Sequence, residues 1–478
     1  MKKWLCIICG LIYDEALGWP DDGIAAGTRW EDVPGDWLCP ECKVGKSDFE
    51  MIEISEPVTA AAVAAVVPVA TLAPLATAVA SVAPVSVPVQ ATRPAGPVVI
   101  IGSGHAGYGL AQALRKQDPN LEIRVLTRES GHVYSKPALS IALAQGRSAT
   151  ALASESPMAV EHRLGIRVYP HCQVERIDSH ARRLHTNLGE ITYGQLVLAS
   201  GAAPIRVPIE GCAEALVSVN NLSDYQAFRT QLVGMRRIAI LGDGLIGCEF
   251  ANDLASSGFE VRVIGLGAWP MERLLPEPAG LHLQQALSGL GVQWNLQTTL
   301  QRIERSNDGF ELTLANGEQH KADLVLSAIG LRPNQELALA CGLECGRGIK
   351  VDEYLETSIP GIYALGDCIE IDGQLMPYLA PINQGIEALA RTLLGQPTIV
   401  RYPLMPVTVK TPAAPLCLLA APANCSGQWQ IESTADGLSA AFHDDTGTLR
   451  GFALLGRQAQ QQRSAWLQNC QPSQSNVA

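Results

Sequence analysis

Two glycine-rich motifs of the form G-x-G-x-x-G stand 140 residues apart, and each lies between a strand-like and a helix-like segment. The motif at 102–107 follows the apolar run 97–101, and the motif at 242–247 follows the apolar run 237–241. Each motif opens a predicted helix and precedes a further predicted strand: helices over about 105–116 and 246–256, strands at 123–126 and 261–264. This repeated order predicts a parallel sheet in each copy.

Glycines in such a motif let the backbone approach a pyrophosphate, and the helix N-terminus offers N–H groups and a partial positive charge. Two motifs in order predict two bound dinucleotides, FAD at the first and a nicotinamide at the second, although a glycine loop can also be a simple tight turn. The candidate cofactor-binding residues in the motifs are Gly102, Gly104, His105, Ala106, Gly107, Gly242, Gly244 and Gly247.

The end of the second strand of each copy bears on which nucleotide binds, because an acidic residue there usually contacts the ribose. Thr127 stands near that place in the first copy, with Glu129 two residues beyond. The second copy has the neutral run 264–266, and no arginine follows directly to attract a 2′-phosphate. NADH is therefore favoured over NADPH.

Four cysteines form two C-x-x-C pairs near the start of the sequence: Cys6, Cys9, Cys39 and Cys42. The pairs are separated by 29 residues, and each two-residue spacer lets both thiolates of a pair point at one metal ion. This pattern predicts a tetrahedral site of four sulfurs, which suits iron and zinc alike.

Charge is distributed unevenly along the chain. Residues 1–56 carry five basic and twelve acidic groups, a net charge of −7 out of −12 for the whole chain. An acidic leading segment suits docking onto a basic patch of a partner. It argues against nucleic-acid binding, which requires positive charge.

Residues 55–96 are rich in Ala, Val and Pro and are predicted to form an extended linker. The longest run without proline, 58–67, has ten residues, whereas a helix that spans a bilayer needs about 20. The segment is therefore expected to tether two modules rather than to cross a membrane.

Cysteine usage and the first residues bear on location. The apolar run after Lys2 and Lys3 is too short for a secretory signal, and the thirteen cysteines show no disulfide framework. The expected location is the reducing cytoplasm, with transient contact at a membrane surface.

The residues around the cysteine pairs closely resemble a rubredoxin of the kind associated with alkane oxidation, notably at 13–15, 18–20 and 36–37. The resemblance covers residues 1–54 and implies one iron ion held by the four cysteines, which shuttles one electron between the 3+ and 2+ states. The expected aromatic core is Trp4, Tyr13, Trp37 and Phe49. Lys43 departs from the glycine usual after the second pair, a difference that bears on the local solvation and the potential of the iron rather than on the fold.

Residues 97–478 resemble the rubredoxin–NAD reductases, flavoproteins that bind two dinucleotides. Besides the glycine motifs, the segments 196–202 and 357–367 carry the resemblance. It implies FAD and NADH as cofactors and a crossover between the two nucleotide-binding domains at Gly201. The strand that ends in Gly366 and Asp367 suits a carboxylate hydrogen-bonded to the ribityl chain of FAD.

The same resemblance gives three candidate catalytic residues, which also count as cofactor-binding: Lys136, Glu249 and Lys410. It places Lys136 beside the flavin and pairs it with Glu249, and an ion pair there would hold the ring and tune its potential. Lys410 is expected near the pyrimidine end of the ring. Each of the three also has an ordinary structural interpretation.

The implied activity is NADH:rubredoxin oxidoreduction with a fused acceptor: hydride from NADH to FAD, then single electrons to iron. The expected onward acceptor is a membrane-bound alkane monooxygenase, and the alternative is an oxygen- or superoxide-reducing partner. A different class is a zinc-binding interaction module fused to a flavin reductase.

A third class is a disulfide- or peroxide-reducing flavoenzyme. Related peroxidases carry a redox cysteine just after the corresponding Leu-Ser, and here Ile141 takes that place. Cys341 and Cys345 lie in another segment and are interpreted as structural thiols. Electrons are therefore expected to leave the flavin directly for a metal centre.

The predicted fold class is multidomain: a small metal-bound rubredoxin fold, then an α/β, Rossmann-like flavoprotein reductase that binds two dinucleotides, with a small α+β C-terminal domain. The predicted divisions are rubredoxin 1–54, linker 55–96, FAD-binding 97–212, NAD-binding 213–331, FAD-binding 332–395 and C-terminal domain 396–478.

Overall fold

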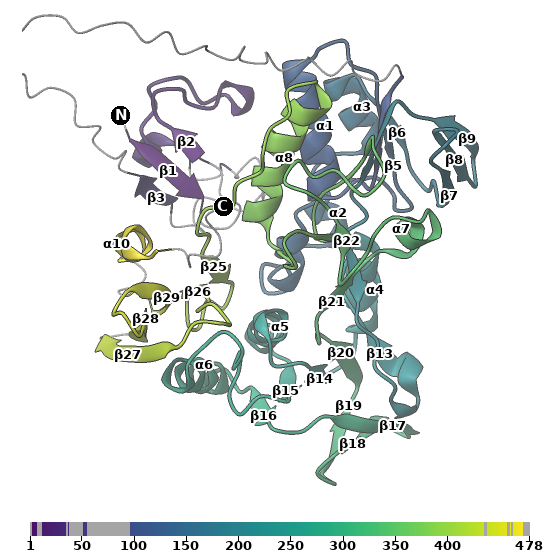
Figure 1. Ribbon diagram of the computed structural model, residues 1–478. Helices are drawn as coiled ribbons and strands as arrows, with labels where there is room; N and C mark the ends of the chain where they lie inside the picture. Colours follow the sequence, from purple (N-terminus) through teal and green to yellow (C-terminus); the bar gives the residue numbers. More distant parts are fainter. Residues whose placement is uncertain are drawn as a thin grey trace, which may run out of the picture.

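A computed structural model of the chain describes residues 2–6, 12–34, 37, 51–54, 96–434, 437–456, 459 and 462–471 (Figure 1). Of the four predicted iron ligands, Cys9, Cys39 and Cys42 lie outside the described residues, and only the backbone of Cys6 is described. Phe49, Lys43 and the predicted linker up to residue 95 also lie outside them.

The first module is a three-stranded antiparallel sheet in the order β2-β1-β3. Its strands are β1 (Lys3–Cys6), β2 (Ile12–Asp14) and β3 (Met51–Ile54). Tyr13 is fully buried on this sheet, and its ring lies 5.6 Å from that of Trp30 and 6.3 Å from that of Trp37. Trp4 joins the cluster, with its ring 6.3 Å from Trp30. An aromatic cluster of this kind gives a small domain the apolar burial that its length otherwise limits.

The carboxylate of Glu15 links the start of the chain to two tryptophans of this cluster, Trp4 and Trp30. It accepts the backbone N–H of Lys2 at 2.8 Å, the backbone N–H of Trp30 at 3.0 Å and the indole N–H of Trp4 at 2.8 Å. These hydrogen bonds, that of Lys2 above all, lower the pKa of Glu15 to about 2. The ionised form is thus favoured in the folded domain.

We expect Glu15→Gln to reduce the stability of this module at neutral pH. The carboxyl has a depressed pKa when folded, so its contribution is complete above the ordinary value of 4.5 and is lost as the pH falls toward about 2. The difference in guanidinium midpoint between wild type and variant, followed by the iron–thiolate absorbance, should therefore shrink below about pH 4.5.

The control for this prediction is Glu31→Gln, because Glu31 pairs with Arg29 at 3.3 Å where both side chains are about 70% exposed. An exposed ion pair contributes little to stability. Equal midpoints for Glu15→Gln and wild type at neutral pH would contradict the role given to Glu15.

The first nucleotide-binding part is built on a five-stranded parallel sheet in the order β23-β10-β4-β5-β6. Its strands are β23 (Ile362–Ala364), β10 (Gln195–Leu198), β4 (Val98–Ile101), β5 (Ile123–Leu126) and β6 (Arg167–Tyr169). The helices α1 (His105–Gln117) and α8 (Leu379–Leu393) pack side by side against it (Figure 1). The apolar runs β4 and β10 are buried, as expected of central parallel strands.

The second part repeats this architecture in the order β13-β20-β14-β15-β16. Its strands are β13 (Leu216–Val217), β20 (Leu324–Ser327), β14 (Arg237–Leu241), β15 (Glu260–Ile264) and β16 (Gln293–Asn295). Its helices are α4 (Leu222–Gln231), α5 (Leu245–Ser256) and α6 (Glu277–Gly289). The predicted duplication of strand–helix–strand units is confirmed, with both helix starts within one residue of the expected positions.

Two short strands, β11 (Ala202–Pro204) and β21 (Leu331–Pro333), pair antiparallel where the chain crosses between the two parts. Smaller elements decorate both sheets: β7 (Val174–Asp178), β8 (Arg183–Thr186), β9 (Gly189–Thr192), α2 (Ala149–Leu152), α3 (Pro157–Leu164), β12 (Glu210–Gly211), β17 (Leu300–Ser306), β18 (Gly309–Leu314), β19 (Gln319–Ala322), α7 (Glu336–Ala340), β22 (Ile349–Lys350) and β24 (Ile369–Glu370). Gly201 directly precedes β11, at the predicted crossover.

The C-terminal part is a five-stranded antiparallel sheet in the order β25-β26-β29-β28-β27. The short helix α10 (Arg463–Asn469) packs against β29, and α6 contacts β28 and β29. The strands are β25 (Val407–Val409), β26 (Leu416–Leu419), β29 (Leu449–Leu455), β28 (Gly437–Asp444) and β27 (Gly427–Thr434). Trp466 of α10 packs on Phe452 of β29 with ring centroids 6.1 Å apart. The other side of α10 faces the first module, where it lies near β3 (Figure 1).

These features confirm the predicted multidomain fold class. The residue numbers at which we divide the domains stay a prediction. Within the part of the chain that the structure describes, no helix is both long and apolar enough to cross a bilayer.

Candidate active site

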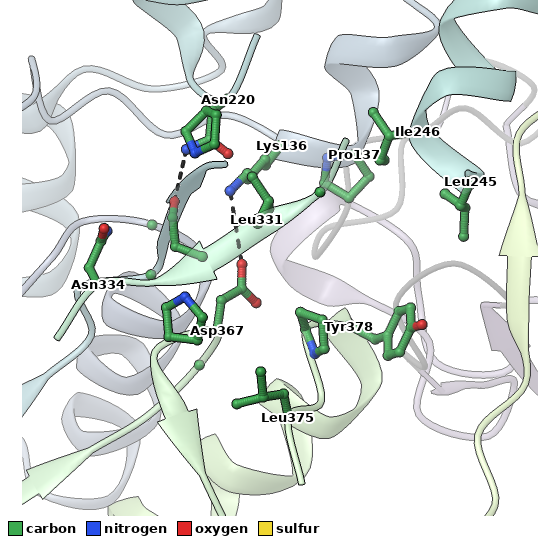
Figure 2. A pocket seen from close by; sticks show the side chains of 18 of the residues that line it. Lys136, Pro137, Asn220, Leu245, Ile246, Leu331, Asn334, Asp367, Leu375 and Tyr378 are labelled. Carbon is green, nitrogen blue, oxygen red and sulfur yellow. Dashed lines mark hydrogen bonds and ion pairs between the residues drawn. The ribbon is translucent and has the colours of Figure 1, made fainter. Parts of the chain in front are cut away.

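A cavity of about 2610 Å³ runs between the two nucleotide-binding parts and reaches the C-terminal sheet; Figure 2 shows part of its lining. Both glycine motifs open onto it, because each follows the C-terminal end of a central strand, where parallel sheets bind their ligands. The cavity brings into one space residues that lie more than 250 positions apart in the sequence.

The first motif forms a cradle that admits no side chain at two positions. Gly102 has a φ of +119°, and an added Cβ would lie 2.1 Å from the carbonyl oxygen of Ala199. A Cβ on Gly107 would lie 1.9 Å from the carbonyl oxygen of Gly102. Gly104, at the start of α1, would meet no protein atom, so its missing side chain leaves room for a ligand instead. This geometry fits the pyrophosphate of FAD at the N-terminus of α1.

The second motif repeats the cradle at the start of α5. Gly242 has a φ of +118°, and a Cβ there would lie 2.5 Å from the carbonyl oxygen of Ala328. A Cβ on Gly247 would lie 2.0 Å from the carbonyl oxygen of Gly242, whereas Gly244 again faces open space. The residues present thus fit a second dinucleotide.

Lys136 and Asp367 point toward one another across the cavity (Figure 2). Lys136 begins the 3₁₀ turn η4 (Lys136–Ser140), and its Nζ lies 3.9 Å from Oδ2 of Asp367. Asp367 follows Gly366, whose φ of +92° turns the chain at the end of β23 and whose Cβ would lie 3.0 Å from that of Ala106. The side chains of this pair are 38% and 17% exposed, so a bound cofactor can compete for either group.

Glu249 is fully buried in α5, and its partner differs from the predicted one. Nζ of Lys410 lies 2.7 Å from both carboxylate oxygens of Glu249, and the backbone N–H of Lys410 donates to it at 2.9 Å. The hydroxyl of Ser140 donates to the same carboxylate at 2.6 Å. The expected pairing of Lys136 with Glu249 is therefore wrong in this structure. Lys136 pairs with Asp367 instead, and the buried carboxylate of Glu249 pairs with Lys410, the residue that follows β25.

Two further polar residues of α5 were not predicted and extend this contact. The side-chain oxygen of Asn252 accepts the backbone N–H of Ala413 at 3.1 Å. The carboxylate of Asp253 accepts the N–H groups of Leu143 and Ala144, and burial raises its pKa to about 6. One face of α5 thereby joins the η4 segment to the C-terminal sheet.

The predicted site residues fall into two groups. Those that line the cavity are Gly102, Gly104, His105, Ala106, Lys136, Gly201, Gly242, Gly244, Gly366, Asp367 and Lys410. Gly107, Gly247 and Glu249 lie behind this lining and shape it, two through backbone packing and one through its ion pair.

Three of the residues that line the cavity were not predicted from the sequence: Asn383, Arg463 and Leu467. Asn383 of α8 was not predicted, and its Oδ1 lies 2.5 Å from Nε2 of the predicted His105, a contact that links the first glycine motif to α8. Arg463 and Leu467 of α10 also line the cavity, and Arg463 donates to the hydroxyl of Thr408 at 3.2 Å. A buried arginine in a short C-terminal helix carries no motif by which the sequence alone would mark it.

Three family models match the chain. Residues 96–387 match the pyridine nucleotide-disulphide oxidoreductases, residues 3–49 match rubredoxin, and residues 399–470 match a rubredoxin-binding C-terminal domain. The first of these covers more than half of the sequence.

Two relatives are similar over most of their own length. A protein of Acinetobacter baylyi named rubredoxin-NAD(+) reductase is 44% identical over 77% of this chain and 96% of its own. A protein of Aeromonas hydrophila named nitric oxide reductase FlRd-NAD(+) reductase is 44% identical over 76% of this chain and 93% of its own.

Among solved structures, a ferredoxin reductase from Rhodopseudomonas palustris superposes with a TM-score of 0.71 at 25% identity, over 80% of this chain and 98% of that one. The chain is therefore an oxidoreductase of the pyridine nucleotide-disulphide oxidoreductase family, with FAD, NADH and iron as its cofactors, and it joins that fold to a rubredoxin and to a rubredoxin-binding domain.

Proposed function

We propose that the chain is an NADH:rubredoxin oxidoreductase that reduces its own rubredoxin module, with Cys6, Cys9, Cys39 and Cys42 as the iron ligands. When bound, FAD accepts a hydride from NADH and releases the two electrons one at a time, which suits a centre that holds a single iron. The names of the relatives and the three family matches support this proposal.

The position of α10 is the observation that carries the proposal. This helix lines the flavin cavity through Arg463 and Leu467, and it lies near β3 of the rubredoxin module on its other side (Figure 1). This seven-residue helix thus contacts both the cavity proposed to bind FAD and the rubredoxin module proposed to receive the electrons. We infer that electrons pass from the flavin to the iron across this contact, without a dithiol relay.

The protein's own side chains are proposed to position and charge the cavity. Lys410, fixed by Glu249, presents a cation to the cavity wall, where it favours a negatively charged reduced ring. Lys136 is proposed to exchange its contact with Asp367 for one with the cofactors. Gly366 and Asp367 are proposed to hold the ribityl chain of FAD.

Rapid mixing with NADH tests the electron path. We expect bleaching of the flavin absorbance to be followed by bleaching of the iron–thiolate band in the same molecules, at a rate independent of protein concentration. If the flavin bleaches and the iron does not, the proposal fails. Metal analysis of natively purified protein checks the zinc alternative, since zinc in the four-cysteine site would support an interaction module.

Adding negative charge to α10 should slow electron transfer from flavin to iron and leave the reduction of the flavin by NADH unchanged. Ala465 and Gln468 are exposed on α10, and residues 1–56 carry a net charge of −7. We expect the Ala465→Glu/Gln468→Glu variant to slow flavin-to-iron transfer by about threefold to tenfold at low salt, and less at high salt. The matched control is Met158→Glu on α3, where the side chain is 75% exposed. Equal rates in the α10 variant and the control would contradict docking at α10.

For the onward acceptor we propose a membrane-bound alkane monooxygenase, on the resemblance of residues 1–54 to rubredoxins of alkane oxidation. Contact with it would bring the chain to a membrane surface. A second candidate is an oxygen- or superoxide-reducing partner, and a third is a nitric oxide-reducing partner, which the name of the Aeromonas relative favours. NADH oxidation by the full chain, measured with each isolated acceptor, decides between them.

A further inference from the structure

The second strand of the nicotinamide-binding part ends without an acidic side chain, yet a carboxylate lies at that place. Beyond β15 the chain continues as Gly265, Leu266 and Gly267. A Cβ added to Gly265 would lie 2.3 Å from Cγ of Asp243, the second residue of the glycine motif. Asp243 thus reaches across from β14 and fills the space that a side chain at the end of β15 would take.

Hydrogen bonds fix Asp243 in this position. Its Oδ2 accepts the backbone N–H of Gly267 at 2.8 Å, and its carbonyl oxygen accepts the N–H of Met271 at 2.9 Å. The first nucleotide-binding part has a corresponding contact between two uncharged side chains: the hydroxyl of Ser103, the second residue of its glycine motif, donates to the hydroxyl of Thr127 after β5 at 2.9 Å. In both copies the second residue of the glycine motif is therefore linked to the end of the second strand.

The charges around Asp243 leave its carboxylate uncompensated. Glu272 and Arg273 follow on the same loop, are both exposed, and present opposite charges to the cavity. No ion pair to Asp243 occurs among the residues that the structure describes. A second anion placed beside it would be repelled, whereas a hydroxyl would be accepted as a hydrogen-bond donor.

A separate feature indicates that a ligand belongs at this end of the cavity. Thr298 is 5% exposed and lines the cavity, and its hydroxyl has no hydrogen-bond partner among the described residues. Its backbone N–H donates to the carbonyl of Gly265 at 3.0 Å, so this hydroxyl lies beside the strand end that Asp243 occupies. A buried hydroxyl without a partner costs free energy that a bound polar ligand recovers.

We propose that Asp243 recognises the adenosine ribose of the nicotinamide nucleotide: its carboxylate accepts a hydrogen bond from the 2′-hydroxyl of NADH and repels the 2′-phosphate of NADPH. The acidic residue usual at the end of the second strand is thereby replaced by one inside the glycine motif. This inference rests on the proposed function and gives the preference for NADH over NADPH a positive cause, where the sequence offered only the absence of an arginine.

The test uses the FAD-loaded full chain in its oxidised state, with NAD⁺ and NADP⁺ as probes in calorimetric titrations. Asp243→Asn keeps an oxygen for the N–H of Gly267 and removes only the charge. We expect the variant to bind NADP⁺ about tenfold more tightly than wild type does, while its affinity for NAD⁺ changes by less than about threefold. The flavin absorbance of the variant verifies that it has folded and kept FAD.

Glu272→Gln is the matched control, because it removes a carboxylate from the same cavity end, where Glu272 accepts the N–H of Ala268 at 3.2 Å. An unchanged ratio of NAD⁺ to NADP⁺ affinity in Asp243→Asn would overturn the proposal, as would an equal shift in Glu272→Gln. The titrations involve no electron transfer. A shifted ratio in a chain whose iron is never reduced would therefore leave this inference standing and refute the proposed function alone.

Discussion

Replacing Glu249 with alanine is expected to destabilise the reductase by about 3–5 kcal/mol, the usual cost of removing one member of a buried ion pair. Glu249 is fully buried, and the side chain of its partner Lys410 is only 11% exposed. The change leaves a cation without a carboxylate and the backbone N–H of Lys410 without its acceptor, and it leaves the hydroxyl of Ser140 only the longer contact to the carbonyl of Pro137 at 3.3 Å. Guanidinium unfolding of the FAD-loaded protein, followed by circular dichroism, measures this loss.

The double variant Glu249→Leu/Lys410→Met is the matched control. Apolar residues of similar volume restore much of the stability that a broken buried pair loses, because no charge is left to be solvated. We expect the double variant to be more stable than Glu249→Ala, yet to reduce its flavin more slowly with NADH, since the cation at the cavity wall is gone. A single variant that loses less than about 1 kcal/mol would show that the pair acts like an exposed salt bridge.

Gly244→Ala is expected to raise the KM for NADH about a hundredfold while FAD stays bound and iron stays in place. The backbone at Gly244 has a φ of −79°, which alanine adopts without strain, and a Cβ there would touch no protein atom. The methyl group would instead occupy the space that the pyrophosphate of NADH needs, with the loss of about two charge-assisted hydrogen bonds. Steady-state kinetics with ferricyanide as acceptor measures the effect.

Gly104→Ala makes the reciprocal test in the first motif. Gly104 has a φ of −70° and equally open surroundings. We expect this variant to fold but to lose FAD during purification, whereas Gly244→Ala keeps FAD, which dithionite still reduces. If Gly244→Ala lost FAD instead, the assignment of the two motifs to their nucleotides would be wrong.

The glycine motifs could be located from the sequence because their function is a property of the backbone. A tight turn between a buried strand and a helix needs glycine at fixed spacings, so Gly102 and Gly242 can be recognised from the sequence without knowledge of the tertiary structure. The boundaries of α1 and α5 followed from the same rule. The four-cysteine site is equally local, and it stays a prediction because most of its residues lie outside the described part of the chain.

The partners of the charged residues could not be predicted in this way. Glu249 and Lys410 are 161 positions apart, and either Lys136 or Lys410 satisfies the requirement for a cation near the flavin. Which lysine reaches the carboxylate depends on how the C-terminal sheet packs against α5, a contact that no local pattern encodes. Asn252 and Asp253 did carry a signal, since with Glu249 they stand at i, i+3 and i+4 on one face of a helix otherwise rich in apolar residues.

The polar face of α5 also determines how this molecule can be recombined with its relatives. Through Glu249, Asn252 and Asp253 the helix is bonded to the η4 segment and to the residues that follow β25. If the nicotinamide-binding part were replaced by that of a relative, these three side chains would lose their hydrogen-bond partners. Both partner segments would have to be replaced together with it. The rubredoxin module contacts the reductase near α10, and residues 55–96 between them are predicted to be a linker, so that end of the chain is expected to be exchanged more readily in engineered electron-transfer fusions.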